Sequence, residues 1–235
     1  MRADISGIIA RFPALQIAFV VASDIVWTGE PSAALRQRAA ETEQQLRTAF
    51  QIDAVGLIPE VRVWREAYKA FGVKKTSYRS SVERLLRRVL QGKGLPRISP
   101  FIDVYNEISA RFLLPVGADD LERIEGDIAF RESRPDDGFV PLGGAEEAES
   151  EPPKPGEIVY ADRAKILCRR WNWYQDARSA VSPQTSRAVL TVQCLGTGNL
   201  EQAVDALCRS LQSETGAHTA VRIASSGKPT VELPA

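Results

Sequence analysis

The chain has 235 residues, 44% hydrophobic and 26% charged, and 30 Lys and Arg balance 30 Asp and Glu. This predicts a soluble globular protein with one core; no apolar run approaches the ~20 residues of a membrane helix. Arg11 and Pro13 interrupt the apolar core that a signal peptide needs, so we expect a cytoplasmic protein. The three cysteines and the single histidine, His218, do not cluster. The sequence therefore favours no disulfide framework, zinc site, cofactor or histidine-based triad.

The first half of the chain predicts one strand followed by helices. Residues 15–23 are a continuous apolar run rich in β-branched residues, which is typical of a buried strand. In residues 80–92, Ser80 and Glu83 form an S-x-x-E capping box, and the apolar residues recur at helical spacing. Helices are predicted over residues 31–50, 59–72, 80–92 and 99–117, the last of them ending before Pro115.

The second half predicts strands and turns before a final helix and strand. Asp-Gly and Gly-Gly pairs mark the turns, residues 145–156 form an acidic, proline-bearing connector, and Asn199 is an N-cap. Strands are predicted over residues 127–133, 135–144, 156–162, 164–173, 187–195 and 219–224, with a helix over 199–216. The predicted fold class is α/β, of the mixed α+β kind, with a mixed sheet flanked by helices in a single domain over residues 1–235.

The zero net charge hides two segregated segments. Residues 74–97 hold eight basic residues and one acid, whereas residues 117–151 hold twelve acids and three arginines. A basic face of this density is typical of a site for a polyanion such as nucleic acid. A helix face that is simply exposed to solvent explains the charges equally well. The candidate polyanion-binding residues of this segment are Lys74, Lys75, Arg79, Arg84, Arg87 and Arg88.

Residues 166–177, "ILCRRWNWYQDA", combine arginines with aromatic residues. Strand alternation would place Arg169, Trp171 and Trp173 on one face, with Arg170, Asn172 and Tyr174 on the other. One tryptophan would then stack on a base beside the arginines, while the other packs in the core. The alternative is that the arginines pair with the acids of residues 117–120.

The strings "YRSSVERLLRRVLQGKGLPRISPFIDVYNEISARFLLPVGADDLERIEGDI", "FVPLGGAEE", "PPKPGEIVYAD" and "LCRRWNWYQDA" together resemble the free-standing B3/B4 domain proteins. These proteins are similar to the tRNA-editing module of the phenylalanyl-tRNA synthetase β subunit. The resemblance is strongest over residues 60–200, with residues 1–58 as a strand–helix part of the same fold. It implies a pocket that accepts the aminoacylated 3′ end of tRNA and hydrolyses a wrongly attached amino acid.

The family motifs can be carried over by position. "IDVYN" matches a family segment that supplies an asparagine to the pocket wall, so Asn106 inherits that role and Tyr105 stands in place of a threonine. Gly117 stands where the synthetase has a pocket histidine. "RRWNWYQD" matches a family segment with a specificity glutamate, which places Gln175 or Asp176 near that position. The pocket is therefore expected to differ from the tyrosine-selective one.

The resemblance favours a metal-free trans-editing hydrolase that deacylates mischarged aminoacyl-tRNA. The alternatives are a non-catalytic tRNA- or RNA-binding module and a protein that binds an amino-acid-like small molecule. Asp119 and Asp120 have a second interpretation as caps of the following turn. We also expect no general base with a pKa near neutrality, and the oligomeric state stays open. The candidate catalytic residues are Asn106, Gly117, Asp119, Asn172, Gln175 and Thr185, with Asp120 as a further pocket candidate; the tRNA-binding candidates are the six basic residues above with Arg169, Arg170, Trp171 and Trp173.

Overall fold

The computed structural model describes residues 1–27, 29–73, 77–143 and 152–234. Its strands form a mixed sheet of six strands and an antiparallel sheet of four. The six-stranded sheet contains, in spatial order, β10 (Thr230–Glu232), β1 (Arg2–Asp4), β4 (Ile128–Glu132), β5 (Ile158–Ala161), β6 (Ile166–Arg169) and β7 (Tyr174–Gln175). The four-stranded sheet contains β3 (Val116–Asp120), β8 (Ala188–Leu195), β2 (Leu15–Ser23) and β9 (His218–Ala224).

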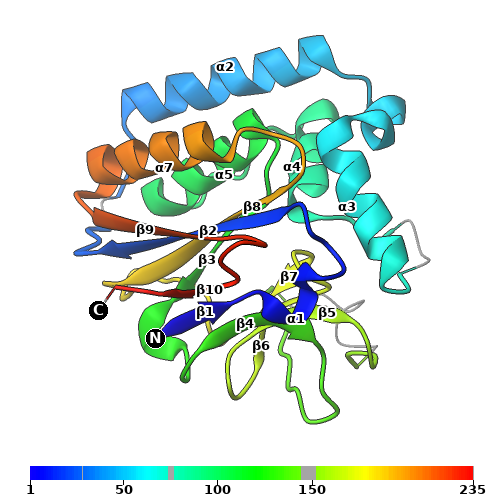
Figure 1. Ribbon diagram of the computed structural model, residues 1–235. Helices are drawn as coiled ribbons and strands as arrows, with labels where there is room; N and C mark the ends of the chain where they lie inside the picture. Colours follow the sequence, from blue (N-terminus) through cyan, green and yellow to red (C-terminus); the bar gives the residue numbers. More distant parts are fainter. Residues whose placement is uncertain (28, 74–76, 144–151, 235) are drawn as a thin grey trace.

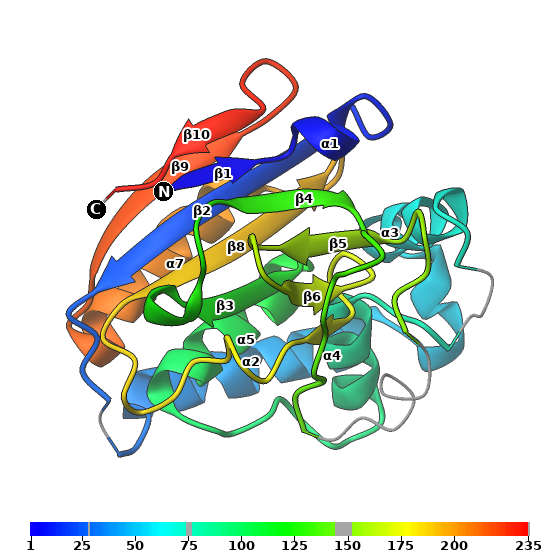
Figure 2. The same cartoon turned by 90° about the horizontal axis from the view of Figure 1, so that it is seen from below.

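Helices cover one face of the four-stranded sheet, and the six-stranded sheet covers the other (Figure 1). Viewed from below, β1, β4 and β5 lie in front of β2 and β8 (Figure 2). This layering confirms the α/β class predicted from the sequence. The helices are α1 (Ser6–Ile9), α2 (Ala33–Ala49), α3 (Pro59–Ala70), α4 (Ser81–Leu90), α5 (Pro100–Phe112) and α7 (Leu200–Thr215), with 3₁₀ turns η1 (Ile52–Leu57) and η2 (Leu121–Arg123).

Strand β2 lies between β8 and β9 and is apolar on both faces. Ala18 and Val20 pack into a cluster with α5 and α7, whereas Ile17 and Phe19 pack into a cluster that includes the six-stranded sheet and α3. Successive side chains of a strand point to opposite faces, so a strand covered on both sides reads as an unbroken apolar run. The interior therefore has an apolar layer on each face of β2.

The predicted helix starts are capped by short polar side chains. Ser32 accepts a hydrogen bond from Leu35 N at 3.0 Å, and Asn199 accepts one from Gln202 N at 3.0 Å. Such caps satisfy backbone N–H groups that have no partner within the helix. Helices α3 and α4 begin without such a cap. At α4 the Ser80 side chain makes no cap hydrogen bond, so the predicted capping box is wrong.

Buried Glu83 instead accepts charge-assisted hydrogen bonds from Arg65 (2.6 Å) and Arg87 (2.8 Å), with Arg79 at 3.4 Å. Burial raises the pKa of the Glu83 carboxyl, but the hydrogen bonds and charges of Arg65 and Arg87 outweigh it and hold the pKa below its usual value. Glu83 therefore ties α3 to α4 rather than capping its own helix.

Two predicted elements end early, and one does not form. The helix predicted over 99–117 ends at Phe112, because Leu113 adopts a left-handed conformation (φ 53°), and Val116–Asp120 forms β3. The strand predicted over 164–173 ends at Arg169. Within the described part of 135–144, Gly138 and Pro141 form only isolated bridges.

The two ends of the described chain lie side by side, because β1 pairs with β10 in an antiparallel register. Residues 1–58 supply β1, β2 and α2 to the layers described above. No described helix is long and apolar enough to cross a membrane.

Candidate functional site

A pocket of about 260 Å³ lies between the two sheets. Its walls come from β3 and β8 on one side, from β5, β6 and β7 on the other, and from α4 and α5. The volume lies just under the 300–1,000 Å³ typical of pockets for drug-sized molecules, which suits a single small group. A Cβ atom placed at Gly117 would meet no heavy atom within 4 Å, so the glycine leaves room in this wall.

A row of hydrogen-bonded polar side chains lies along one wall of the pocket. The buried Asn172 accepts a hydrogen bond from Tyr68 Oη at 2.9 Å and donates one to Gln193 Oε1 at 3.0 Å. Gln193 in turn donates to Thr191 Oγ1 at 3.3 Å. Asn172 therefore fixes the orientation of the Gln193 amide, which lines the pocket with Thr191.

Asp119 lies on β3 with only 4% of its surface exposed. Its Oδ1 accepts hydrogen bonds from Ser179 Oγ at 2.7 Å and from Gln175 Nε2 at 3.0 Å. Burial raises the pKa of Asp119 to about 7, although these two bonds oppose the rise. A carboxyl with a pKa near neutrality in this pocket was not foreseen from the sequence, and the expectation that no such group acts as a general base stays a prediction.

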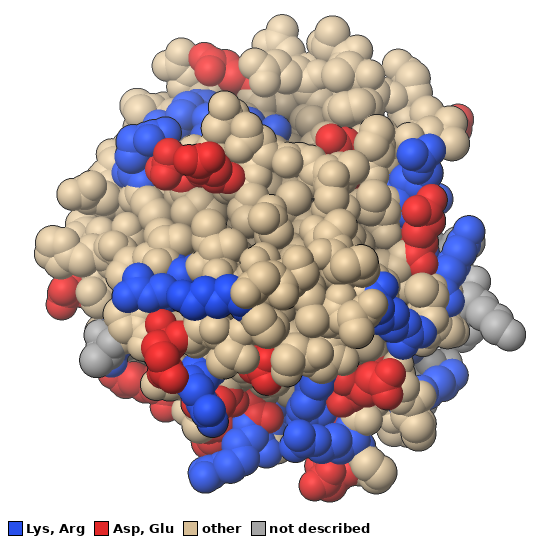
Figure 3. All heavy atoms as spheres, in the orientation of Figure 1, with Lys and Arg blue, Asp and Glu red and all other residues tan. Residues whose placement is uncertain are grey.

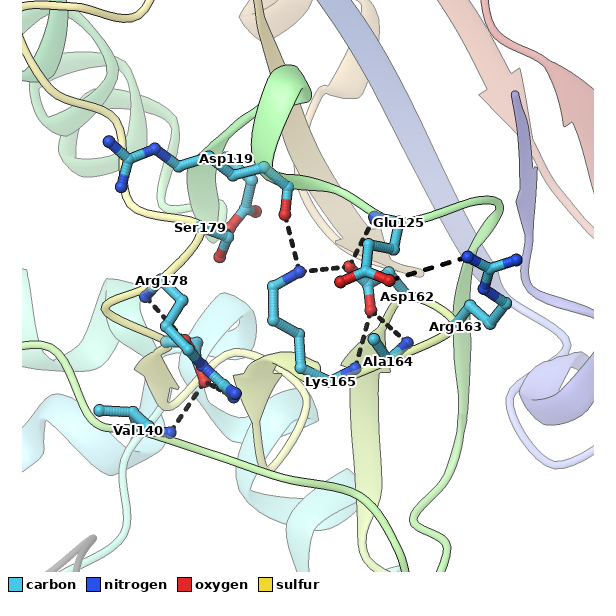
Figure 4. A network of polar contacts seen from close by, with 11 residues as sticks. Asp119, Glu125, Val140, Asp162, Arg163, Ala164, Lys165, Arg178 and Ser179 are labelled. Carbon is cyan, nitrogen blue, oxygen red and sulfur yellow. Dashed lines mark hydrogen bonds and ion pairs between the residues drawn. The ribbon is translucent and has the colours of Figure 1, made fainter.

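Lys165, whose positive charge acts on Asp119, forms its ion pair with another carboxylate. Figure 4 shows Lys165 directed toward Asp162, with which it forms a 2.6 Å ion pair, and its ammonium also donates to the Arg123 carbonyl at 2.7 Å. No Lys or Arg among the described residues forms an ion pair with Asp119. The carboxyl is thus held by neutral donors only.

Two tyrosines extend this wall. Tyr160 is 2% exposed and stacks on Phe130, with ring centroids 4.6 Å apart, and its hydroxyl has no hydrogen-bond partner among the described residues. Burial and the charge of Asp119 raise the pKa values of both Tyr160 and Tyr105, so both phenols are neutral at physiological pH. Burial likewise raises the pKa of Cys168, so this thiol is not an activated nucleophile.

The segment from Arg169 to Tyr174 forms a tight turn between β6 and β7. Arg170 and Trp171 have positive φ angles of 46° and 67°, and Trp173 N donates to Arg169 O at 3.0 Å. A turn of this kind breaks the alternation of a strand, so the predicted two-faced arrangement is wrong.

Both tryptophans of this turn are buried, and neither forms an exposed stacking platform. Trp171 is fully buried and packs edge-on against Phe12 and Trp64, with ring centroids 4.7 and 5.2 Å away. Trp173 is 4% exposed and lines the pocket. The predicted base-stacking role on an exposed tryptophan is therefore overturned, and Trp173 is a pocket wall.

The arginines of the turn are buried around Glu157. Arg169 Nε donates to Glu157 Oε1 at 2.8 Å, and Arg170 Nε lies 3.7 Å from Glu157 Oε2. Arg170 also lies over the rings of Tyr78 and Trp173, 3.5 and 4.2 Å from their centroids. These cations are internal, so their predicted contact with a polyanion is wrong, as is the alternative that they pair with acids of residues 117–120.

A basic groove lies beside the pocket along α4. It encloses about 480 Å³ and shares Ser81 and Arg84 with the pocket. Arg84 is exposed, donates to the Trp173 carbonyl at 2.9 Å and lies 4.2 Å from the centroid of the Tyr174 ring. The other basic residues of this groove, which we call the α4 groove, are Arg79, Arg87, Arg88 and Lys93.

In the described part of the acidic segment, residues 117–143, acids pair with arginines of other elements. Asp127 pairs with Arg2 at 2.8 Å, and Glu132 lies 3.6 Å from Arg11. Figure 3 shows basic and acidic side chains intermixed along its lower part, where Figure 1 places the six-stranded sheet.

Comparison with known proteins decides the family. A family model described as the B3/4 domain matches residues 63–215, which is more than half of the chain. The chain belongs to the B3/4 domain family. This confirms the resemblance found in the sequence.

One solved structure similar to this B3/4 domain is an N-terminal fragment of the phenylalanyl-tRNA synthetase β subunit from Pyrococcus horikoshii. The identity is 13% and the TM-score 0.42, and the match covers 86% of this chain and 46% of that chain. The present chain thus spans about half of the synthetase fragment. No curated protein matches.

The pocket of this B3/4 domain contains some of the predicted catalytic candidates and not others. Gly117, Asp119, Asn172 and Gln175 line it. Asn106 lies instead in the α4 groove, and its neighbour Tyr105 lines the pocket. The predicted place of Asn106 in the pocket wall is therefore wrong, because adjacent residues of a helix point about 100° apart.

Asp120 and Thr185 form a capping contact outside the pocket. Asp120 accepts hydrogen bonds from Glu122 N at 3.0 Å and from Thr185 Oγ1 at 2.7 Å. The first bond caps η2, as the alternative interpretation of Asp120 predicted. Thr185 therefore supports the cap and is absent from the pocket wall that the sequence assigned to it.

Several pocket residues were missed. Thr191 and Gln193 are two residues apart in the otherwise apolar β8, "AVLTVQCL", so both lie on the same face of the strand. This spacing is a signal that sequence analysis could have used. Tyr160 carries no such signal, because a buried tyrosine is ordinary. Lys74 and Lys75, predicted to bind a polyanion, lie outside the described residues. Among those described, no three His, Cys, Asp or Glu side chains gather as metal ligands would.

Proposed function

We propose that this B3/4 domain is a hydrolase that deacylates mischarged aminoacyl-tRNA in trans. The observation that carries the proposal is the continuity of two hollows: a small polar pocket and the basic α4 groove share Ser81 and Arg84. An aminoacylated tRNA end has the same two parts, a small aminoacyl group esterified to the terminal ribose and the sugar–phosphate chain that leads to it. Basic side chains supply the sequence-independent part of nucleic-acid affinity.

The entrance of the groove is built to hold anionic groups. Arg88 and Lys93 are exposed, and Arg84 is fixed between the Trp173 carbonyl and the Tyr174 ring. Arg87 is partly exposed, but its guanidinium is bound to Glu83, so it is less available to an anionic ligand than Arg88 or Lys93. The family relation to a phenylalanyl-tRNA synthetase module favours tRNA as the polyanion.

Hydrolysis of an aminoacyl ester needs a positioned water and stabilisation of the charge that develops on the carbonyl oxygen. Gln193 and Thr191 provide amide and hydroxyl groups in the pocket, and the contact with Asn172 fixes Gln193. We assign to this pair the placement of water or of the carbonyl oxygen. Asp119 lies on the β3 wall of the same pocket.

A deacylation screen tests the proposal. Purified protein is incubated with a panel of misacylated tRNAs, each labelled in the amino acid, and the rate of ester loss is compared with the spontaneous rate. The proposal predicts catalytic turnover of at least one mischarged tRNA and none of the correctly charged form of that tRNA. Binding without ester loss across the whole panel would replace the hydrolase with a non-catalytic tRNA-binding module.

The role of the α4 groove is tested by charge reversal. Arg88→Glu combined with Lys93→Glu is expected to weaken tRNA binding and to flatten its dependence on salt, because each lost phosphate contact removes about one unit of the salt slope. Arg222→Glu is the matched control, because Arg222 is exposed on β9, outside the groove. Equal effects of the two changes would show that the groove does not bind tRNA.

A further inference from the structure

The wall of the pocket formed by Asp119, Tyr105 and Tyr160 presents hydrogen-bonding atoms that no described residue uses. Asp119 receives its two side-chain hydrogen bonds on Oδ1, and its Oδ2 accepts none from the part of the chain that the structure describes. The Tyr160 hydroxyl is buried and without a partner. All three residues line the pocket. Buried polar groups in folded proteins are almost always paired, so an unpaired set in a pocket points to a ligand that completes it.

The chemistry of this wall selects a cationic donor. A carboxylate oxygen only accepts hydrogen bonds, and a phenol oxygen accepts as well as donates. Arg84 is the one cationic side chain among the described pocket residues, and it is bound to the Trp173 carbonyl and the Tyr174 ring. Lys165 is paired with Asp162. The wall therefore contains a buried carboxyl without a counter-ion, beside aromatic rings that also favour a cation.

We propose that Asp119, Tyr160 and Tyr105 form a binding site for an ammonium group of the ligand. The inference rests on the proposed function for its source: an aminoacyl ester carries a free α-ammonium group next to the bond that is cut. A side-chain ammonium group would present the same chemistry. In both cases the ammonium group supplies the positive charge that the described residues do not provide for Asp119. An acylated amine is neutral, so a substrate that carries one is not expected to bind at this site.

This assignment makes Asp119 a binding residue rather than a general base. An ammonium ion beside the carboxylate favours its charged form, so a bound ligand lowers the tendency of Asp119 to take a proton. The groups that face or influence Asp119 are Ser179, Gln175, Asp176, Lys165, Tyr105, Tyr160 and the thiol of Cys168. Of these, Asp176 and Lys165 are each paired with another residue, Arg178 and Asp162.

The test uses small amines and needs no tRNA. The Asp119 carboxyl is followed by carbon-detected NMR through a pH titration, alone and with L-alaninamide, which has an α-ammonium group and a neutral carbonyl. We expect the apparent pKa of Asp119 to fall by about one unit or more when L-alaninamide binds, as for a carboxyl beside an opposite charge. N-acetyl-L-alaninamide, which lacks the cation, should leave the titration unchanged.

A second arm identifies the source of the ammonium group. N-acetyl-L-lysinamide carries only a side-chain ammonium, so a shift with it and not with L-alaninamide assigns the site to a side chain. The reverse result assigns it to the α-amine, and a shift with both supports a general ammonium site. No shift with either amine, or an equal shift with N-acetyl-L-alaninamide, would overturn the proposal.

Variants separate the site from general effects on the fold. Tyr160→Phe removes only the unpaired hydroxyl and is expected to weaken L-alaninamide binding about tenfold, the effect of one lost hydrogen bond to a charged group. Asp120→Asn, the adjacent carboxyl outside the pocket, should leave the affinity unchanged. Equal affinities for Tyr160→Phe and the wild type, with both folded, would contradict the assignment of that hydroxyl.

The kinetic readout distinguishes binding from proton transfer once a deacylated tRNA is known. Asp119→Asn should raise KM at least tenfold and leave most of kcat, whereas a large loss in kcat alone would make Asp119 a general base and overturn its role here. If no tRNA is deacylated but the amine still binds, the proposed hydrolase activity is rejected and the ammonium site stands. If a tRNA is deacylated but no amine binds, the ammonium site is rejected and the hydrolase activity stands.

Discussion

The β6–β7 turn and the pocket wall formed by Asp119, Tyr105 and Tyr160 both contain buried ionisable groups. The charges of the turn are paired with opposite charges, whereas that of Asp119 is not paired within the described part of the chain. In the turn, Arg169 and Arg170 surround Glu157, so each buried charge has an opposite charge beside it. In the pocket, the described residues offer Asp119 only neutral donors and give the Tyr160 hydroxyl no hydrogen-bond partner. A buried polar group that is fully paired stabilises one structure, whereas an unpaired one costs stability and stays available to a ligand. We therefore interpret the turn as a structural element and propose that the pocket wall binds a ligand.

Removal of the shared carboxylate in the turn gives the largest expected effect. Glu157→Ala leaves Arg169 and Arg170 buried without their counter-charge and should lower the free energy of unfolding by about 3–5 kcal/mol. Urea denaturation measures the change. Glu132→Ala is the control, because Glu132 lies in an exposed pair with Arg11 and should change stability by less than about 1 kcal/mol. A mild effect at Glu157 would mean that the turn is not held by its charges.

The polar row of the pocket should matter for activity more than for folding. Gln193→Ala removes an amide that Asn172 holds in place, and we expect a loss of about 2–3 kcal/mol of transition-state stabilisation, typical of one preorganised donor. The ratio kcat/KM for deacylation measures it. Asn106→Ala, outside the pocket, should cost far less. A larger loss at Asn106 than at Gln193 would return the catalytic role to the residue that the family motif indicated.

Because the Tyr160 hydroxyl is buried without a partner among the described residues, its removal is expected to stabilise the protein. Tyr160→Phe removes a buried polar atom without a partner and keeps the ring that stacks on Phe130, so the free energy of unfolding should rise by about 1 kcal/mol. Thermal and urea unfolding measure the difference. Destabilisation would show that the hydroxyl is satisfied in the folded protein, which would remove one part of the contrast with the turn.

The smallest effect is expected at the single histidine. His218 is exposed at the start of the edge strand β9, away from the pocket. His218→Ala should leave stability within about 0.5 kcal/mol and deacylation close to wild type. An inactive His218→Ala protein that still folds would reject the proposed site.

The sequence correctly predicted the elements whose formation depends on neighbouring residues in the chain. The apolar run of residues 15–23 became β2, and Asn199 caps α7 as expected. Glu83 shows the limit: its spacing from Ser80 fits a capping box, but Arg65 on another helix competes for the carboxylate. A charged donor forms a stronger hydrogen bond than a neutral N–H group, so tertiary contact overrode the local motif.

The candidate site was predictable in part. Position along the family motif brought Gly117, Gln175 and Asn172 to the pocket, but on α5 it selected Asn106 where the helix turns Tyr105 inward. The partner of Arg169 could not be read from the chain, because Glu157 meets it only through the pairing of β5 with β6. The raised pKa of Asp119 also follows from burial between two sheets, which no local pattern contains.

Asp119→Asn tests the contrast most directly, because asparagine keeps the shape of the side chain and removes its charge. The folded pKa of about 7 lies above the unfolded value near 3.8, so the folded protein holds a proton that the unfolded chain has lost. Stability contributed by this proton is present below pH 4 and is lost as the pH rises to 7. The cost of the charged form at pH 8 is on the order of 4 kcal/mol.

The decisive measurement is the free energy of unfolding of wild type and Asp119→Asn at pH 5 and pH 8, with Asp120→Asn as the control. We predict that Asp119→Asn is more stable than wild type at pH 8, and that this advantage is far smaller at pH 5, where Asp119 is protonated in the folded protein. The control should show no such dependence. If Asp119→Asn were less stable than wild type at pH 8, the charge of Asp119 would be a structural contact like those of the turn, and the account of the pocket wall would fail.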